Sequence, residues 1–253
     1  NLDPAYARKG KMTIAKPNVK IPAPIPKCRP IGKSVAARNS AALLNKFAAL
    51  VHEALENHPV NVNRKSSGYQ PANFLLMRDA GTKTPKVKPL SQKFGFHGVA
   101  VADMPVELGI AKVIGIDTKV FPPDRSLEGY AQRAREAMQL VSRYDLVYVH
   151  LKGPDEPGHD GDFEGKKKSI EDIDAGFFSN IDLDRKLLCV TADHSTPCLS
   201  KGHTDDPVPI LVAGENVDAD GSQRFTEEYA RKGTLGTVKH GYEIMGILKK
   251  LST

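Results

Sequence analysis

Apolar residues in the first third of the chain recur at the spacing of one long amphipathic helix. Between residues 39 and 57 they stand three and four positions apart, which places them on one face of a helix. The helix is expected to end in the stretch NHPVN, because Pro59 disfavours helical backbone at His58. The apolar run ANFLLMR, residues 72–78, is expected to form a short strand that ends in Arg78.

The stretch DAGTKTPKVKPL follows that run, and its composition is typical of a linker. We therefore expect two domains, residues 1–85 and residues 86–253. Beyond the linker, short apolar runs alternate with amphipathic segments. The expected strands are FHGVAVA, DLVYVHL, KLLCVTA and VPILVAG, and the expected helices are a short one ending near Ile114, then 126–143, 165–181 and 242–251. This alternation predicts an α/β fold with a mostly parallel sheet flanked by helices.

The composition is that of an ordinary globular protein. The chain has 253 residues, of which 40% are hydrophobic, and no apolar run approaches the roughly 18 residues of a membrane span. The opening stretch NLDPAYARKG lacks the apolar region of a signal peptide. Three cysteines without a CxxC pair, Cys28, Cys189 and Cys198, favour a reduced compartment. These features predict a cytoplasmic protein with no membrane partner.

The positive charge is concentrated near the start of the chain. The formal net charge is +6, and residues 1–38 hold nine Lys or Arg against a single acid, Asp3. Three interpretations stay open: a solvated face, a basic mouth for a small anionic substrate, and a nucleic-acid surface. No interleaved aromatic residues and no recognised nucleic-acid motif accompany the charge, so we expect no nucleic-acid partner. Nothing in the sequence indicates an oligomeric state.

Acidic and imidazole side chains follow two predicted strands at the point where each strand ends. Asp155 and His159 follow DLVYVHL, Asp193 and His194 follow KLLCVTA, and His203 comes nine residues after His194. In open α/β sheets, ligand sites lie at the carboxyl ends of the strands. Carboxylate and imidazole ligands together suit zinc or manganese. Asp155, His159 and His203 are sufficient for a three-ligand site, and Asp193 and His194 begin a second site.

Each of these residues also has an ordinary structural interpretation as a helix cap, a turn residue or a surface imidazole. Five of them at two consecutive strand ends are harder to explain in that way. A pair of divalent ions is the usual means of stabilising the attacking and leaving oxygens in phosphoryl transfer. The pattern therefore points to metal-assisted chemistry on a phosphate.

Several stretches of the chain closely resemble one family. They are HLKGPDEPGHDGDFEGK, TADHSTPC, a histidine before DPVPILVAG, and the tail EEYARKGTLGTVKHGYEIM. It is that of the archaeal-type cofactor-independent phosphoglycerate mutases, members of the alkaline phosphatase superfamily. The resemblance extends over essentially the whole chain. It implies an alkaline-phosphatase-like core, a mostly parallel sheet flanked by helices, over residues 86–253. Residues 1–85 would then be part of a smaller α+β cap domain that closes over the substrate.

The resemblance also implies an activity and its cofactors. Such enzymes interconvert 3-phosphoglycerate and 2-phosphoglycerate through a phosphoserine, at a site with two divalent ions (Mn, Zn, Mg or Co). Carried over by motif, one ion would be held by Asp155, His159 and His203, and the other by Asp193 and His194. Arg78 resembles an arginine that grips the phosphate or carboxylate of the substrate, for which a guanidinium is well suited.

Two departures from the family pattern bear on activity. The nucleophilic serine and a further aspartate ligand are expected upstream of Asn1, so the chain is interpreted as a C-terminal portion that is inactive alone. Ser195 is interpreted as shaping the loop rather than as that nucleophile. Relatives carry a basic residue where this chain has Leu108, beside Glu107; Lys112, one helical turn further on, is the candidate replacement.

Two other functions are consistent with these departures. One is a metal-dependent phosphatase or other phosphoryl hydrolase on the same core, which Glu107 and Leu108 favour. The other is a non-catalytic truncated relative that binds a metal or a partner only.

Overall fold

The computed structural model describes residues 6–9, 12–15, 24–77 and 83–252. The chain divides into two compact units, Asn1–Thr82 and Lys83–Thr253. The cap and core roles expected for residues 1–85 and 86–253 stay predictions. Within the described residues, no helix combines the length and the apolar character that crossing a membrane requires.

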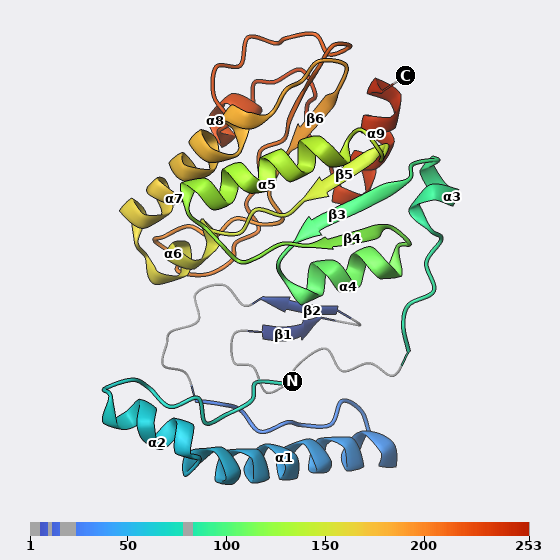
Figure 1. Cartoon of the computed structure of the whole chain (residues 1–253). Helices are drawn as coiled ribbons and strands as arrows, with labels where there is room; N and C mark the ends of the chain where they lie inside the picture. Colours follow the sequence, from blue (N-terminus) through green and yellow to red (C-terminus); the bar gives the residue numbers. More distant parts are fainter. Residues whose placement is uncertain (1–5, 10–11, 16–23, 78–82, 253) are drawn as a thin grey trace. The chain divides into compact units, whose positions relative to one another are not determined.

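The described residues of the first unit form a strand pair and two helices (Figure 1). Its elements are β1 (Tyr6–Lys9), β2 (Met12–Ala15), α1 (Val35–Glu56) and α2 (Pro59–Ser66). The two strands are antiparallel, with Tyr6 opposite Ala15. The predicted helix over 39–57 is confirmed and begins earlier, because the Ser34 hydroxyl accepts a hydrogen bond from the amide of Ala37 and caps it.

The predicted end of the first helix is confirmed, because α1 stops at Glu56, before His58. Pro59 in addition begins α2, at a position where its missing N–H costs nothing. The strand predicted over residues 72–78 was wrong over its described part. Residues 72–77 form no strand. Their backbone is bonded instead to side chains of the helices: the Asn61 amide bonds both backbone groups of Ala72, and His52 Nδ1 lies 2.9 Å from the carbonyl oxygen of Asn73.

A three-stranded parallel sheet lies at the centre of the second unit, in the order β4-β3-β5 (Figure 1). Its elements are α3 (Leu90–Phe94), β3 (Gly98–Ala102), α4 (Pro105–Val113), β4 (Asp117–Val120), α5 (Leu127–Leu140) and β5 (Leu146–Val149). Every residue of β3 is buried. Val99 and Val101 pack with Leu140 of α5, whereas Ala100 packs with Ala111 of α4. Because alternate residues of a strand face opposite sides, the two helices cover opposite faces of the sheet.

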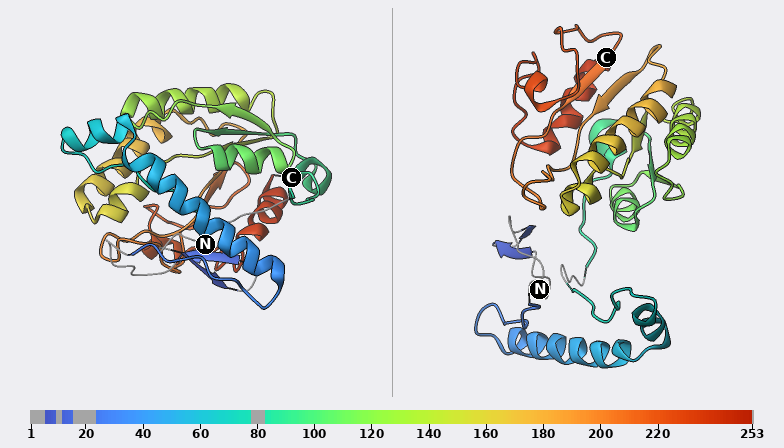
Figure 2. Two further views of the ribbon diagram at one scale, coloured as in Figure 1. Left: turned by 90° about the horizontal axis from the view of Figure 1, so that it is seen from below. Right: turned by 90° about the vertical axis from the view of Figure 1, so that its left-hand side faces the viewer.

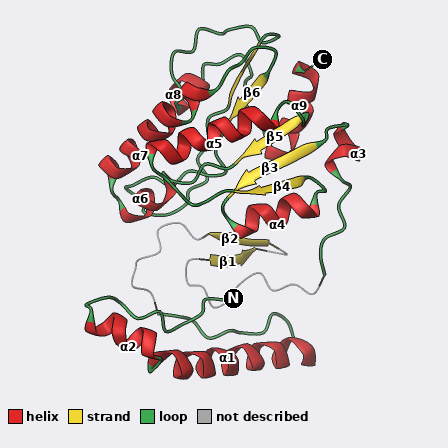
Figure 3. Ribbon diagram, in the orientation of Figure 1, coloured by secondary structure: helices red, strands yellow, loops and turns green. Residues whose placement is uncertain are grey.

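The rest of the unit carries a second, smaller sheet (Figure 3). Its elements are α6 (Asp155–Asp160), α7 (Phe163–Gly176), η1 (Phe178–Asn180), β6 (Leu187–Val190), β7 (Leu211–Gly214), α8 (Glu227–Ala230), η2 (Gly241–Glu243) and α9 (Ile244–Leu251). Strands β6 and β7 pair antiparallel, with Leu187 opposite Gly214. Helix α9 lies beside β6 (Figure 2). The parallel arrangement predicted from the sequence is thus confirmed for β3, β4 and β5, whereas the last two predicted strands run antiparallel.

Helix α7 packs against α5 so closely that a side chain is excluded at their contact. A methyl group on Gly176 would lie 2.6 Å from the carbonyl oxygen of Leu127 and 2.9 Å from Tyr130 Cβ. Tyr130 and Phe177 form a buried cluster at this contact. The close approach holds α7 on the sheet layer, and α7 follows directly on α6, the helix that begins at Asp155.

We expect Gly176→Ala to lower the free energy of unfolding by about 1–3 kcal/mol, the usual cost of overpacking. Gly109→Ala is the matched control, because a methyl group there meets nothing within 4 Å. Gly109 lies inside α4, so alanine should stabilise by about 0.5 kcal/mol. Urea titration of both variants measures the two changes. Equal stability of the two variants would show that α5 and α7 are not in this contact.

Candidate metal centre

Asp155 and His159 lie on one side of a short helix that follows β5. Helix α6 begins at Asp155, and residues four apart on a helix are neighbours on its surface. Asp155 Oδ1 is 3.4 Å from His159 Nε2. The DxxxH spacing seen in the sequence therefore brings two ligand atoms together by local structure alone.

The loop between β6 and β7 brings two more imidazoles to the same place. Ser195 and Thr204 form an isolated antiparallel bridge, in which the amide of Thr204 donates to the carbonyl of Ser195 at 3.1 Å. This bridge folds the loop back on itself. As a result the rings of His194 and His203 stack, with 3.7 Å between their centroids.

Three ligand atoms converge where the two loops meet. His203 Nε2 is 3.1 Å from His159 Nε2 and 3.7 Å from Asp155 Oδ1. Ligand atoms about 2.0–2.1 Å from one tetrahedral ion stand about 3.4 Å apart. The three separations, together with the mixed carboxylate and imidazole chemistry, fit a single divalent ion. Asp155, His159 and His203 form the only group of this kind within the described residues.

The second predicted pair lies beside this group. His194 Nε2 is 3.3 Å from Asp193 Oδ2, a separation that also fits two ligands of one ion. The Asp193 side chain is 76% exposed, whereas that of His194 is 27% exposed. Because His194 stacks on His203, the pair and the three-residue group belong to one site rather than to two separate places.

Outer hydrogen bonds orient the imidazoles. His159 Nδ1 is 3.3 Å from the carbonyl oxygen of Lys201. A carbonyl can only accept, so Nδ1 carries the proton and Nε2 keeps its lone pair for a metal. His194 Nδ1 lies 3.1 Å from Thr196 Oγ1, so this ring, like that of His159, has a hydrogen-bond partner at Nδ1.

The electrostatics keep the ligands in the forms that bind metal. Burial raises the pKa of Asp155, but hydrogen bonds from Lys152 Nζ at 2.7 Å and Thr196 Oγ1 at 2.8 Å outweigh it and lower the pKa to about 2. Burial, followed by the nearby His194, lowers the pKa of His203. At neutral pH the site therefore presents a carboxylate and a neutral imidazole, as metal ligation requires.

Of the two predicted substrate-binding residues, only Lys112 falls within the described part of the chain, and it is not a member of this group. Arg78 lies outside the described residues. Lys112 is exposed in the last turn of α4, about 10 Å along the helix from its first turn at 1.5 Å per residue. Glu107, in the first turn, has Oε1 3.9 Å from Nε2 of His150, the residue that follows β5. The substrate roles of Arg78 and Lys112 stay predictions.

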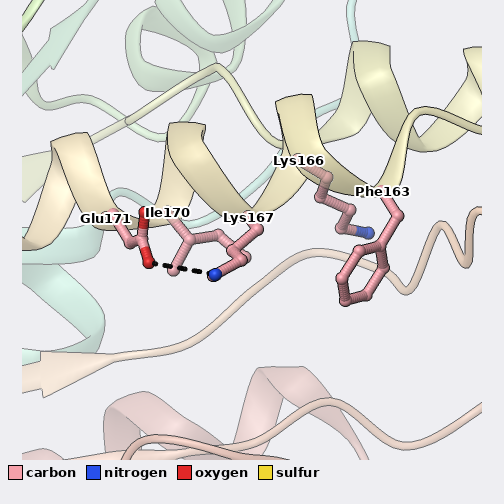
Figure 4. Close-up of a pocket in the computed structure, with 5 residues that line it drawn as sticks. All are labelled: Phe163, Lys166, Lys167, Ile170 and Glu171. Atoms are coloured by element: carbon pink, nitrogen blue, oxygen red, sulfur yellow. Dashed lines mark ion pairs between the residues drawn. The ribbon is translucent and has the colours of Figure 1, made fainter.

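Sequence reasoning missed three residues that support the site: Lys152, Lys166 and Thr196. Lys152 stands three residues before Asp155, a spacing at which two charges of opposite sign pair. Lys166 Nζ on α7 donates to the carbonyl of Thr196 at 2.7 Å. Figure 4 shows Lys166 beside a hollow along α7, which it lines with Phe163, Lys167, Ile170 and Glu171. None of the predicted site residues lines that hollow.

The known proteins that the chain resembles in sequence are metalloenzymes and phosphoglycerate mutases. A family model described as the Metalloenzyme superfamily matches residues 58–247. A 2,3-bisphosphoglycerate-independent phosphoglycerate mutase from Aeropyrum pernix is 40% identical, over 97% of this chain and 59% of its own length. One from Methanocaldococcus jannaschii is 36% identical, over 88% of this chain and 55% of its own length. The chain thus spans little more than half the length of these curated relatives.

Two solved structures resemble the chain in fold. The PH0037 protein from Pyrococcus horikoshii superposes with a TM-score of 0.68 at 31% identity, and covers 86% of this chain and 58% of its own. A cofactor-independent phosphoglycerate mutase from Thermoplasma acidophilum superposes with a TM-score of 0.54 at 27% identity, and covers 87% of this chain and 54% of its own.

We expect His159→Ala to weaken zinc or manganese binding by at least about 100-fold. Loss of a residue that only hydrogen-bonds to a metal ligand already costs about 10–100-fold, and His159 is itself a proposed ligand. Isothermal titration calorimetry on the 253-residue chain measures the change. The control is His97→Ala, because the His97 side chain is 65% exposed and its Nε2 lies 3.8 Å from Asp117, outside the group. Equal losses in both variants, or none in either, would contradict the assignment of His159.

Gly158 allows α6 to lie against the loop after β6. A methyl group there would come within 2.5 Å of the carbonyl oxygen of Thr196. We expect Gly158→Ala to displace α6 and to weaken metal binding about tenfold. Gly202→Ala is the control, because its nearest contact would be an ordinary 3.7 Å to the carbonyl oxygen of Ser200. Wild-type affinity in Gly158→Ala would mean that this close approach does not position the ligands.

Proposed function

Because the chain belongs to the Metalloenzyme superfamily, we propose that it supplies the metal-binding part of a cofactor-independent phosphoglycerate mutase. Its fold is alkaline-phosphatase-like, with a parallel sheet flanked by helices. The observation that carries the proposal is the convergence of Asp155 and His159, on helix α6, with His203, on the loop between β6 and β7. The activity is proposed for the complete polypeptide that contains these residues, because the mutase relatives are longer than this chain.

The proposed reaction is the interconversion of 3-phosphoglycerate and 2-phosphoglycerate, an intramolecular phosphoryl transfer. Asp155, His159 and His203 would hold one divalent ion, and Asp193 and His194 would contribute to a second. When bound, such ions (Mn, Zn, Mg or Co) supply Lewis-acid stabilisation of the charge on the phosphate oxygens. A role in glycolysis and gluconeogenesis, in the cytoplasm, follows from this activity.

The chain's own cations suit an anionic substrate. Lys152 lies beside the proposed ligands, with its ammonium 2.7 Å from Asp155 Oδ2. Arg78 is proposed to hold the phosphate or the carboxylate with its planar guanidinium, and Lys112 to take the place of the basic residue missing at Leu108. The first unit is proposed to act as a cap. By excluding water it would direct the phosphate to a hydroxyl of the substrate rather than to hydrolysis.

One observation favours a second candidate, a metal-dependent phosphatase on the same core. Glu107, in the first turn of α4, has Oε1 3.9 Å from His150 Nε2. An acidic group stands beside the position where the mutase family carries a cation, and a carboxylate there repels a substrate phosphate. A mutase must hold its substrate while the phosphate moves from one hydroxyl to the other, whereas a phosphatase only passes the phosphate to water, so a lost substrate contact costs the phosphatase less.

A coupled assay that follows 2-phosphoglycerate formation from 3-phosphoglycerate tests the proposal on the complete polypeptide. We expect turnover without added bisphosphoglycerate. A chelator should abolish that turnover, and manganese should restore it. His159→Ala and Asp193→Ala should each lower it by at least about 100-fold, since loss of an outer-shell partner alone costs 10–100-fold. His97→Ala should leave it unchanged.

A generic phosphomonoester assayed in parallel separates the two candidate functions. Its rapid hydrolysis, with no conversion of 3-phosphoglycerate, would replace the mutase by the phosphatase. Mutase turnover that survives exhaustive chelation would rule out the metal centre as its basis.

A further inference from the structure

A single buried hydroxyl touches both sets of proposed ligands. Thr196 is 4% exposed. Its Oγ1 donates to Asp155 Oδ1 at 2.8 Å and lies 3.1 Å from His194 Nδ1. We infer that Thr196 is a positioning residue that couples the ligand set of Asp155 to the ligand set of His194. The inference rests on the proposed function, in which these two sets hold two ions.

The direction of both hydrogen bonds follows from the number of protons available. A threonine hydroxyl has one proton, and the Asp155 carboxylate can only accept, so that proton belongs to the Asp155 bond. Oγ1 is then left to accept from the imidazole. His194 must therefore carry its proton on Nδ1. Its Nε2 keeps a lone pair, and that atom lies 3.3 Å from Asp193 Oδ2, where the second pair of ligands converges.

The position of Thr196 is held from three sides. The Lys166 ammonium of α7 donates to its carbonyl at 2.7 Å. Helix α6 packs against it at Gly158, where an added methyl group would lie 3.1 Å from Thr196 Cγ2. The hydroxyl, bonded at Asp155 and His194, makes the third contact. With the backbone and methyl group held, the hydroxyl has little freedom to leave either partner, so it fixes the two ligand sets relative to one another.

The two roles of the side chain are separable by substitution. Thr196→Val keeps the shape and removes the hydroxyl, whereas Thr196→Ser keeps the hydroxyl and removes the methyl group. A residue that matters only for packing would be more sensitive to serine. A residue that orients ligands through its hydroxyl would be more sensitive to valine.

The first measurement is zinc affinity of the 253-residue chain by calorimetry. We expect Thr196→Val to weaken binding 10–100-fold, the usual cost of losing an outer-shell partner, and Thr196→Ser to stay close to the wild type. Wild-type affinity in the valine variant would overturn the inference. So would a loss in the serine variant equal to that in the valine variant.

The second measurement is the tautomer of His194 in the metal-free chain, from long-range proton–nitrogen NMR at mildly alkaline pH. The signal is assigned with His194→Gln. The wild type should carry the proton on Nδ1, and Thr196→Val should shift the population toward Nε2. A wild-type ring protonated on Nε2 would overturn the inference even if the valine variant failed to fold.

The two measurements also separate this inference from the proposed function. If the wild type and His159→Ala bind zinc equally weakly, the proposed metal centre fails. The tautomer still decides whether Thr196 links the two loops in that case. If the wild type binds zinc tightly and Thr196→Val binds equally well, only the coupling role fails.

Discussion

The half-buried carboxylate of Asp155 is the group on which the candidate site depends. One oxygen accepts a hydrogen bond from Thr196 and faces His159 and His203, and the other accepts from Lys152. Burial alone would favour the neutral acid, and these donors reverse that preference and lower its pKa to about 2. A charged Asp155 adds the anionic ligand of the three-residue group to the two neutral imidazoles.

The fold delivers this group by bringing together loops that are far apart in sequence. Strand β5 leads into α6, and β6 leads into the loop that carries His194 and His203, yet β5 and β6 belong to different sheets. Contact between the loops depends on small features: Gly158, which leaves room for Thr196, and the bridge between Ser195 and Thr204. The site is therefore an arrangement of loops on a rigid layered core, as is usual for α/β proteins.

Two lysines bind acceptors at the candidate site. Lys152 neutralises Asp155, and Lys166 binds a main-chain carbonyl of the adjacent loop. The ammonium of Lys152 contacts Oδ2, whereas Oδ1 of the same carboxylate faces His159 and His203.

The sequence by itself determined the local parts of this protein. Helical spacing predicted α1, the DxxxH spacing paired Asp155 with His159, and buried apolar runs located β3, β5, β6 and β7. It missed β4, because the DTKV sequence carries charge and is largely exposed, and it predicted a strand at 72–77 where the backbone bonds to Asn61 instead. The sequence also grouped His203 with Asp155 and His159, but only the tertiary structure brought their ligand atoms together. It alone decided that β6 and β7 run antiparallel and that Thr196 lies between the ligand sets. Those facts depend on long-range packing between loops, which no periodicity in the chain encodes.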